Sequence, residues 1–295
     1  KVNDFIKKDL SKFSIFIISK SGETLETLTN FNIILNNFKK RKKNISKNFI
    51  IISERNSVLF NFARENNILF YEHNANLSGR YSVLSEAGLL MFNLDYKKII
   101  QGINSVLKKD LKKNLISNAA NLLTFITKSK IDTHVSLIYS HSLLSYGYWH
   151  QQLLAESIGK NGKDFTPIIS ECPKDHHSIM QLYLDGKRNK FFTFFKIINN
   201  KKDLLIKDYF DQKFKKSSLN NIIDAQFNAT TNVFKKNLIP FRVILIDQKK
   251  PIQSFISLLV YSMLETAILC KALNLNPFNQ PAVEAIKKET YSLLS

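Results

Sequence analysis

The sequence predicts an α/β protein in which mainly parallel sheets are covered by helices on both faces. Continuous apolar runs, typical of strands buried on both faces, alternate with segments whose apolar residues recur every three or four positions. This alternation indicates strand–helix–strand units, which build parallel sheets. The pattern occurs twice, so we expect one domain over residues 1–99, a second over residues 100–275, and a C-terminal helix within 276–295.

Seven apolar runs have the length and the composition of strands. They are FSIFII (13–18), FIIIS (49–53), ILFYEH (68–73), VSLIY (135–139), TPIIS (166–170), KFFTFFKI (190–197) and FRVILI (241–246). Apolar residues at helical spacing predict helices between several of these runs. The expected helices span 24–41, 142–158, 252–273 and 278–293.

The most apolar long stretch of the chain is 254–273. It contains Glu265 and Lys271, and charged side chains are costly within a bilayer. We therefore expect a buried core helix there, and no association with a membrane.

The chain carries a formal net charge of +19 in 295 residues. A strongly positive net charge has two interpretations. The protein has a surface that binds a polyanion, or its lysines lie on solvated faces and mildly favour the binding of a small anionic substrate. The densest run, KKRKK (39–43), falls where a helix is expected to end, and cations there suit the helix dipole. No helix-turn-helix, zinc-finger or RNA-binding signature is visible. We therefore expect solvated faces and no nucleic-acid partner.

The chain has two cysteines, Cys172 and Cys270, which are far apart and lack the spacing of metal ligands. This usage is typical of reduced, structural thiols in a cytoplasmic protein. The sequence contains neither GxGxxG nor the P-loop pattern GxxxxGK[ST]. We expect no organic cofactor and no metal.

A hydroxyl-rich turn, SKSGETLET (19–27), joins the first expected strand to the first expected helix. The unpaired N–H groups and the dipole of a helix N-terminus bind anions, and Gly22 allows the backbone to approach a ligand closely. A phosphate monoester fits this turn better than a triphosphate, because the P-loop spacing is missing. The alternative is that Ser21 only caps the helix. The candidate phosphate ligands are Ser19, Lys20, Ser21, Thr24 and Thr27.

The turn ISKSGETLETL (18–28) resembles the phosphosugar-binding turn of sugar isomerase domains, and in particular that of the phosphoglucose isomerase family. Further segments resemble that family in the same order, namely GRYSVLSEAGL (79–89), QQLLAESIGKNG (151–162), DHHSIMQLYLDG (175–186), FFTFF (191–195) and NPFNQPAVEAIK (276–287). The resemblance implies two three-layer sugar isomerase domains. It also implies reversible aldose–ketose isomerisation of glucose 6-phosphate and fructose 6-phosphate, in glycolysis and gluconeogenesis.

An aldose–ketose isomerase needs a base beside the carbonyl carbon and a group that stabilises the enediolate. By resemblance, Glu156 in LLAESIGK is the base, and the Arg80 guanidinium in SGRYS faces the enediolate. Burial would raise the proton affinity of such a carboxylate, and an arginine stays charged at any working pH. Without the resemblance, the sequence would indicate only an ordinary glutamate at the end of a helix for Glu156. For Arg80 it would indicate an arginine that forms an ion pair at the surface. The family usually has Gly where this chain has Ser78.

The histidine pair in KDHHS supplies a group that gives or takes a proton near neutral pH. By resemblance, His177 takes part in ring opening and reaches the active site of the partner subunit, which implies a homodimer. His176 stands where the family often has Gln. Adjacent histidines seldom aim at one ion, so we expect no metal here.

The last helix is expected to carry Gln280 and Lys287, which are seven residues apart and would project from one helical face. By resemblance, Lys287 touches the ring oxygen and Gln280 orients the sugar phosphate. Glu284 is an expected intrahelical partner of Lys287. Ile286 stands where the family often has Gly.

The family carries a glycine-rich segment, similar to GIGGS, upstream of the phosphate turn, and this chain has none. We therefore expect the chain to lack the N-terminal part of the first domain, which leaves its sheet one strand short with an exposed edge. We also expect residues 1–295 alone to have little or no activity.

Other functions stay open at this point. A non-catalytic phosphosugar-binding module would keep the turn without the acid–base set. A related isomerase would also accept mannose 6-phosphate.

Overall fold

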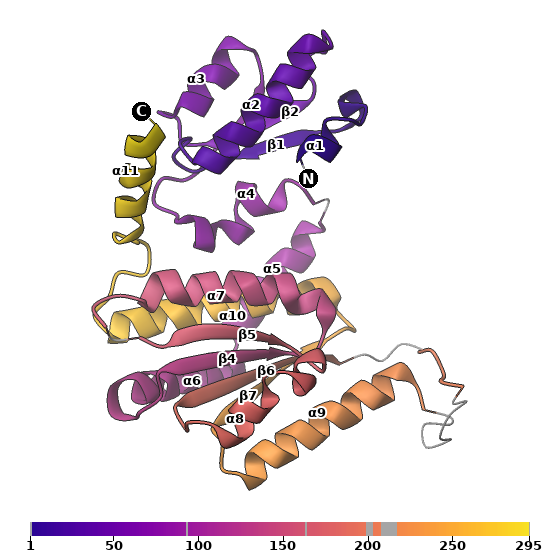
Figure 1. The fold of residues 1–295 in the computed structure, drawn as a ribbon, viewed down its shortest axis with the longest axis vertical. Helices are drawn as coiled ribbons and strands as arrows, with labels where there is room; N and C mark the ends of the chain where they lie inside the picture. The colour runs from indigo at the N-terminus through magenta and orange to yellow at the C-terminus, as the bar shows by residue number, and fades with distance from the viewer. Residues whose placement is uncertain (1, 93, 163, 199–202, 208–216, 295) are drawn as a thin grey trace. The chain divides into compact units, whose positions relative to one another are not determined.

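A computed structural model describes residues 2–92, 94–162, 164–198, 203–207 and 217–294. The chain forms two compact units, Lys1–Leu94 and Asp95–Ser295 (Figure 1). The expected boundary between residues 99 and 100 falls inside helix α5 (Tyr96–Val106), whose N-cap is Asp95. That each unit is a sugar isomerase domain, and that 276–295 is a separate part, stay predictions.

The first unit is built on a three-stranded parallel sheet in the order β1-β2-β3. Its strands are β1 (Ile15–Ile18), β2 (Phe49–Ser53) and β3 (Leu69–Glu72). Its helices are α1 (Val2–Phe5), α2 (Leu25–Lys40), α3 (Val58–Glu65) and α4 (Glu86–Leu89), with 3₁₀ turns η1 (Leu10–Lys12) and η2 (Gly79–Leu84).

The core of the first unit forms where α2 packs on the sheet. Phe31, Leu35 and Phe38 recur at helical spacing along α2 and are buried. The rings of Phe31 and Phe38 lie 5.4 and 4.9 Å from the ring of Phe49 on β2. The expected helix over 24–41 is therefore confirmed, with bounds one residue inside the expected ones.

The second unit is built on a four-stranded parallel sheet in the order β5-β4-β6-β7. Its strands are β4 (Thr133–Ile138), β5 (Thr166–Glu171), β6 (Lys190–Ile198) and β7 (Phe241–Asp247). Its remaining helices are α6 (Lys109–Lys128), α7 (Leu144–Ile158), α8 (Met180–Asp185), α9 (Leu219–Lys236), α10 (Pro251–Ala272) and α11 (Val283–Leu294), with 3₁₀ turns η3 (His141–Leu143) and η4 (Lys174–His177).

Helices cover both faces of this second sheet (Figure 1). On one face, Phe192 and Phe194 of β6 pack against Phe227 and Phe234 of α9. On the other face, a separate core cluster joins residues of α6, α7 and α10 to the sheet. The three-layer α/β arrangement and all seven expected strands are confirmed.

Helix α10 is long and apolar enough to cross a membrane by length and composition, with a mean hydropathy of 1.6. It packs against α5, α6 and α7, and it buries Leu258, Leu259 and Leu269. Glu265 is 2% exposed and pairs with Arg242 of β7. These contacts confirm the expected core helix.

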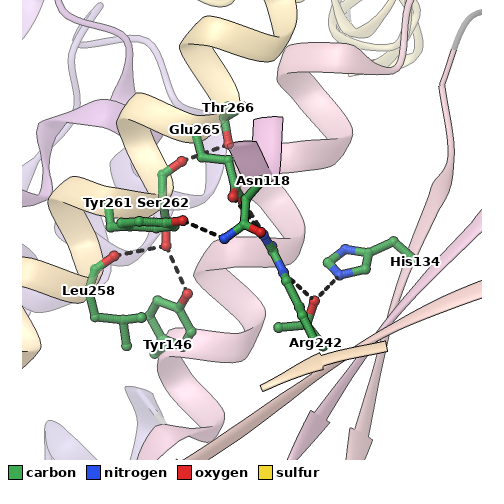
Figure 2. Close-up of polar contacts among 10 residues, drawn as sticks. Asn118, His134, Tyr146, Arg242, Leu258, Tyr261, Ser262, Glu265 and Thr266 are labelled. Carbon is green, nitrogen blue, oxygen red and sulfur yellow. Dashed lines mark hydrogen bonds and ion pairs between the residues drawn. The ribbon is translucent and has the colours of Figure 1, made fainter. Parts of the chain in front are cut away.

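A buried polar network joins α10 to the sheet (Figure 2). Arg242 Nη1 and Nη2 donate to the two carboxylate oxygens of Glu265 at 2.6 and 2.8 Å. Arg242 Nε donates to Thr193 Oγ1 at 3.0 Å, and His134 Nε2 lies 2.7 Å from the same oxygen. The network therefore links β4, β6, β7 and α10.

Candidate active site

The phosphate turn lies between the end of β1 and the start of α2. Ser19 is 4% exposed, its Oγ lies 2.9 Å from Thr24 Oγ1, and it accepts from Thr24 N at 3.4 Å. Thr24 is the N-cap of α2, and Ser21 Oγ instead accepts from Glu23 N at 3.2 Å. The alternative interpretation of Ser21 as the helix cap is therefore wrong, and Ser21 is exposed.

Gly22 is required by the close packing of this turn. Its φ is +72°, which favours glycine, and an added Cβ would lie 2.5 Å from Ser57 Cβ. Ser57 is the N-cap of α3, so the N-terminus of α3 lies beside the turn. The local electrostatics favour an anion, since a helix N-terminus carries a partial positive charge.

Lys20 contributes a half-buried cation to the turn. Its Nζ lies 3.8 Å from Glu54 Oε1, and its backbone oxygen accepts from Ser53 Oγ at 3.2 Å. Thr27 lies in the first turn of α2 and is half-buried. The structure thus brings all five predicted phosphate ligands to one strand-to-helix turn.

Arg80 lies in η2 of the first unit and is 2% exposed. The interpretation as half of a surface ion pair is therefore wrong. The centre of its guanidinium lies 5.9 Å from the centroid of the Tyr81 ring. Ser82 Oγ donates to the Gly79 carbonyl at 2.7 Å, which fixes the turn that carries the arginine. A buried guanidinium interacts more strongly with a developing negative charge than one in water does.

Glu156 lies near the C-terminal end of α7 in the second unit and is half-buried. Its Oε1 accepts from Gln152 Nε2 at 2.9 Å, one helical turn earlier. Next to it, Ser157 Oγ donates to the Pro277 carbonyl at 3.3 Å, and Lys160 Nζ donates to the Asn276 carbonyl at 2.5 Å. These contacts hold the segment that precedes Gln280 against the end of α7.

The two adjacent histidines have different surroundings. His176 is half-buried, and its Nε2 lies 2.7 Å from Tyr139 Oη and 3.4 Å from Thr230 Oγ1. Burial, and then the neighbouring His177, lower the pKa of His176. His177 is exposed at the end of η4. The structure therefore assigns the packing role to His176 and leaves His177 at the surface.

The C-terminal helix differs from the expectation. Helix α11 begins at Val283, so Gln280 lies in the preceding turn, where its carbonyl accepts from Val283 N at 3.3 Å. The prediction that Gln280 and Lys287 share one helical face is wrong, because Pro281 stands between Gln280 and the helix start. Lys287 Nζ donates to Glu284 Oε1 at 2.7 Å, which confirms the expected partner.

The sequence reasoning missed a charged group formed by His141, Glu171 and Lys174. His141 Nδ1 lies 2.8 Å from Glu171 Oε1, and Lys174 Nζ lies 3.3 Å from Glu171 Oε2. Hydrogen bonds from His141, and then from Lys174, lower the pKa of Glu171. These residues lie at or just after the carboxyl ends of β4 and β5, where open α/β sheets bind ligands. That position was the signal that could have found them.

The predicted residues thus fall into two sets. The five phosphate ligands and Arg80 lie in the first unit, while Glu156, His177, Gln280 and Lys287 lie in the second. Within the described part of the chain, no group of three or more His, Cys, Asp or Glu residues is arranged to hold a metal ion.

Solved structures with the same architecture define the class of this protein. A hypothetical protein from Thermus thermophilus superposes with a TM-score of 0.90 at 22% identity, over 100% of this chain and 74% of that one. A glucose-6-phosphate isomerase from Chlamydia trachomatis superposes with a TM-score of 0.84 at 18% identity, over 99% of this chain and 61% of that one. The chain therefore has the sugar isomerase type of α/β fold.

Sequence comparison then gives the family. The family model for phosphoglucose isomerase matches residues 2–238. A probable glucose-6-phosphate isomerase from Methanococcus maripaludis is 34% identical, over 100% of this chain and 69% of the relative. The glucose-6-phosphate isomerase from Methanocaldococcus jannaschii is also 34% identical, over 98% of this chain and 73% of the relative. This chain belongs to the phosphoglucose isomerase family.

Proposed function

We propose that the protein is an aldose–ketose isomerase that interconverts glucose 6-phosphate and fructose 6-phosphate through an enediol(ate). The observation that carries this proposal is that a chain matched by the family model over 2–238 retains both the hydroxyl turn and the acid–base residues. A module that only binds phosphosugars would need the turn and not the acid–base set.

The phosphate of the substrate binds at residues 19–27. The N-terminus of α2 and Lys20 supply positive charge, and the hydroxyls of Ser21 and Thr27 supply hydrogen bonds. The hydrogen bond between the buried Ser19 and the exposed Thr24 keeps the turn in one conformation. Gly22 allows the backbone to approach the phosphate closely.

Glu156 is the base. Its carboxylate takes the proton from C2 of the open-chain aldose, the C2–H electron pair forms the C1=C2 double bond, and the carbonyl electron pair moves onto O1 to give the enediolate. The same carboxyl group then returns the proton to C1, while the proton of the O2 hydroxyl passes to O1 and the C2 carbonyl forms. The guanidinium of Arg80 stabilises the enediolate charge. General acid–base help of this kind contributes roughly 10²–10⁴ in rate, and charge stabilisation often contributes more.

Ring opening precedes isomerisation and needs a proton on the ring oxygen. Lys287 contacts that oxygen, His177 transfers the proton, and Gln280 orients the sugar phosphate. His177 is exposed in its own unit, which fits a side chain that reaches the site of a partner subunit. The active unit is then a homodimer.

The reaction belongs to glycolysis and gluconeogenesis, and we place it in the cytoplasm. Cys172 is a free, buried thiol and Cys270 is also buried, which fits a reducing compartment.

A coupled assay with glucose 6-phosphate and fructose 6-phosphate tests the proposal. We expect turnover in both directions, a loss of at least about a hundredfold in Glu156→Gln, and little change in Glu65→Gln, because Glu65 is exposed at the end of α3. Binding of the phosphosugar without turnover would make the protein a sensing module instead. Offering mannose 6-phosphate in the same assay defines the substrate range.

A further inference from the structure

Glu54 brings a carboxylate to the phosphate turn. It lies between the end of β2 and Ser57, the N-cap of α3. Its Oε1 lies 3.8 Å from Lys20 Nζ, and the side chains of Lys20 and Glu54 are 35% and 32% exposed. The proposed isomerisation does not use this glutamate, and a negative charge beside a phosphate site opposes the binding of an anion. Its presence there therefore needs a reason.

The backbone of the same residue has the opposite effect, because it supports the turn. Glu54 N donates to the Lys20 carbonyl at 2.9 Å, and Ser53 Oγ donates to the same carbonyl at 3.2 Å. In a trans peptide the N–H points away from the C=O, so the N–H of Ser21 faces away from β2. Among the described residues this N–H has no acceptor, which leaves it for a phosphate oxygen. The backbone thus prepares the turn for an anion, and the side chain of Glu54 opposes it.

The contact between Lys20 and Glu54 is an ion pair and not a hydrogen bond. An N–O distance of 3.8 Å exceeds the range of a hydrogen bond, so Glu54 does not fix the direction of the ammonium group. The carboxylate acts through its charge, since it offsets part of the positive charge that Lys20 offers to a phosphate. Glu54 is half-buried, so solvent screens its charge less than the charges of Glu23 and Glu26, which are exposed at the same turn.

The position of this charge decides which kinetic quantity it changes. The substrate, the enediolate and the product carry the same phosphate ester, so a charge beside the phosphate affects the binding of all three equally. Such uniform binding changes the affinity without changing the barrier of the isomerisation step. A site that bound the phosphate very tightly would also retain the product, and product release limits the turnover of many enzymes.

We propose that the carboxylate of Glu54 sets the affinity of the phosphate turn, and that it lowers this affinity for substrate and product alike so that the product is released. The proposal rests on the proposed binding of a phosphosugar at residues 19–27. It does not depend on the acid–base chemistry of Glu156.

Isothermal titration calorimetry with glucose 6-phosphate and with inorganic phosphate tests the proposal. Glu54→Gln removes the charge and keeps the backbone donor, so we expect both ligands to bind about threefold or more tightly at low ionic strength. The gain should vanish in about 1 M salt, where the Debye length is about 3 Å. Glu54→Asp keeps the charge and should bind like the wild-type protein. Glu65→Gln is the matched control, because Glu65 is exposed at the other end of α3.

Steady-state kinetics adds a readout that a merely structural role would not produce. In Glu54→Gln the KM for glucose 6-phosphate should fall while kcat does not rise. Unchanged or weaker binding in Glu54→Gln, an equal gain in Glu65→Gln, or an equal gain in Glu54→Asp would each overturn the proposal. Tighter binding in Glu54→Gln without turnover by any variant would support the proposal and refute the isomerase function. If the wild-type protein bound neither ligand, both the phosphate site and the proposal would be wrong.

Discussion

Arg242 and Glu265 form a bidentate ion pair inside the second unit, with N–O distances of 2.6 and 2.8 Å. The two side chains are 12% and 3% exposed, so neither charge is well solvated. The pair joins the edge strand β7 to α10, which packs in turn against α7, the helix of Glu156.

Glu265→Gln is expected to destabilise the protein by about 3–5 kcal/mol, because the change leaves the Arg242 charge buried without its counter-charge. Chemical unfolding measures this loss. Glu284→Gln is the matched control, since its partner Lys287 is half-exposed and such a pair contributes about 0.5 kcal/mol or less. The double change Arg242→Met with Glu265→Leu should recover most of the loss. Equal losses of unfolding free energy in Glu265→Gln and Glu284→Gln would show that the buried ion pair stabilises the protein no more than the exposed one.

The stability of the protein is expected to fall as the pH drops from about 6.5. Burial lowers the pKa of His150 to about 3 and holds the pKa of His134 well below its ordinary value. Below pH 6.5 the unfolded chain therefore binds protons that the folded chain excludes. Each such histidine costs about 1.4 kcal/mol per pH unit between the two pKa values, and above pH 6.5 the cost vanishes.

Unfolding free energies between pH 7.5 and pH 5 check this expectation. His150→Phe keeps the ring that stacks on Tyr146 and should reduce the slope by about one proton. His177→Asn, at an exposed position, should leave the slope unchanged. A slope that His150→Phe does not alter contradicts the buried, neutral state of this histidine.

Gly22→Ala is expected to destabilise the first unit and to abolish phosphosugar binding. A left-handed backbone at a non-glycine residue costs about 1–2 kcal/mol, and the new Cβ would also collide with Ser57. Gly162→Ala is the matched control, because Gly162 has a φ of +64° with no atom within 4 Å of the added Cβ. Thermal unfolding and titration with glucose 6-phosphate separate the two effects. Unimpaired binding in Gly22→Ala would remove the turn from the substrate site.

Substituting His177 should affect catalysis, whereas substituting His176 should affect stability. His177→Asn should slow turnover of ring-closed sugar phosphate by about 10²-fold or more, with little change in stability. His176→Ala should cost about 1–3 kcal/mol of stability, because the hydroxyl of the buried Tyr139 loses its hydrogen-bond partner. Steady-state kinetics and unfolding curves measure both. If His176→Ala lost activity and His177→Asn did not, His176 and not His177 would be the histidine that takes part in ring opening.

The sequence predicted the seven strands and the helices α2, α7 and α10 because their signals are local, whereas long helices such as α6 and α9 were not among the expected ones. Continuous apolar runs such as 190–197 can be buried on both faces only as central strands, and α2 shows its buried face as a helical stripe. The predicted start of α11 was wrong, because the spacing of apolar residues does not show where a proline-containing turn ends and the helix begins.

Burial and long-range pairing could not be predicted from the sequence. The burial of Arg80 depends on how the chain folds around η2, and no local pattern encodes it. Arg242 and Glu265 lie in different elements, so their pairing appears only once β7 and α10 are packed together. The grouping of His141 with Glu171 depends likewise on the pairing of β4 with β5.

Deuterium incorporation at C2 of glucose 6-phosphate in heavy water measures the step that defines the proposed chemistry. The wild-type protein and Glu65→Gln should exchange this proton, whereas Glu156→Gln should still bind the sugar phosphate and lose the exchange by at least about 10²-fold. Exchange by Glu156→Gln at the wild-type rate would contradict the assignment of Glu156 as the base.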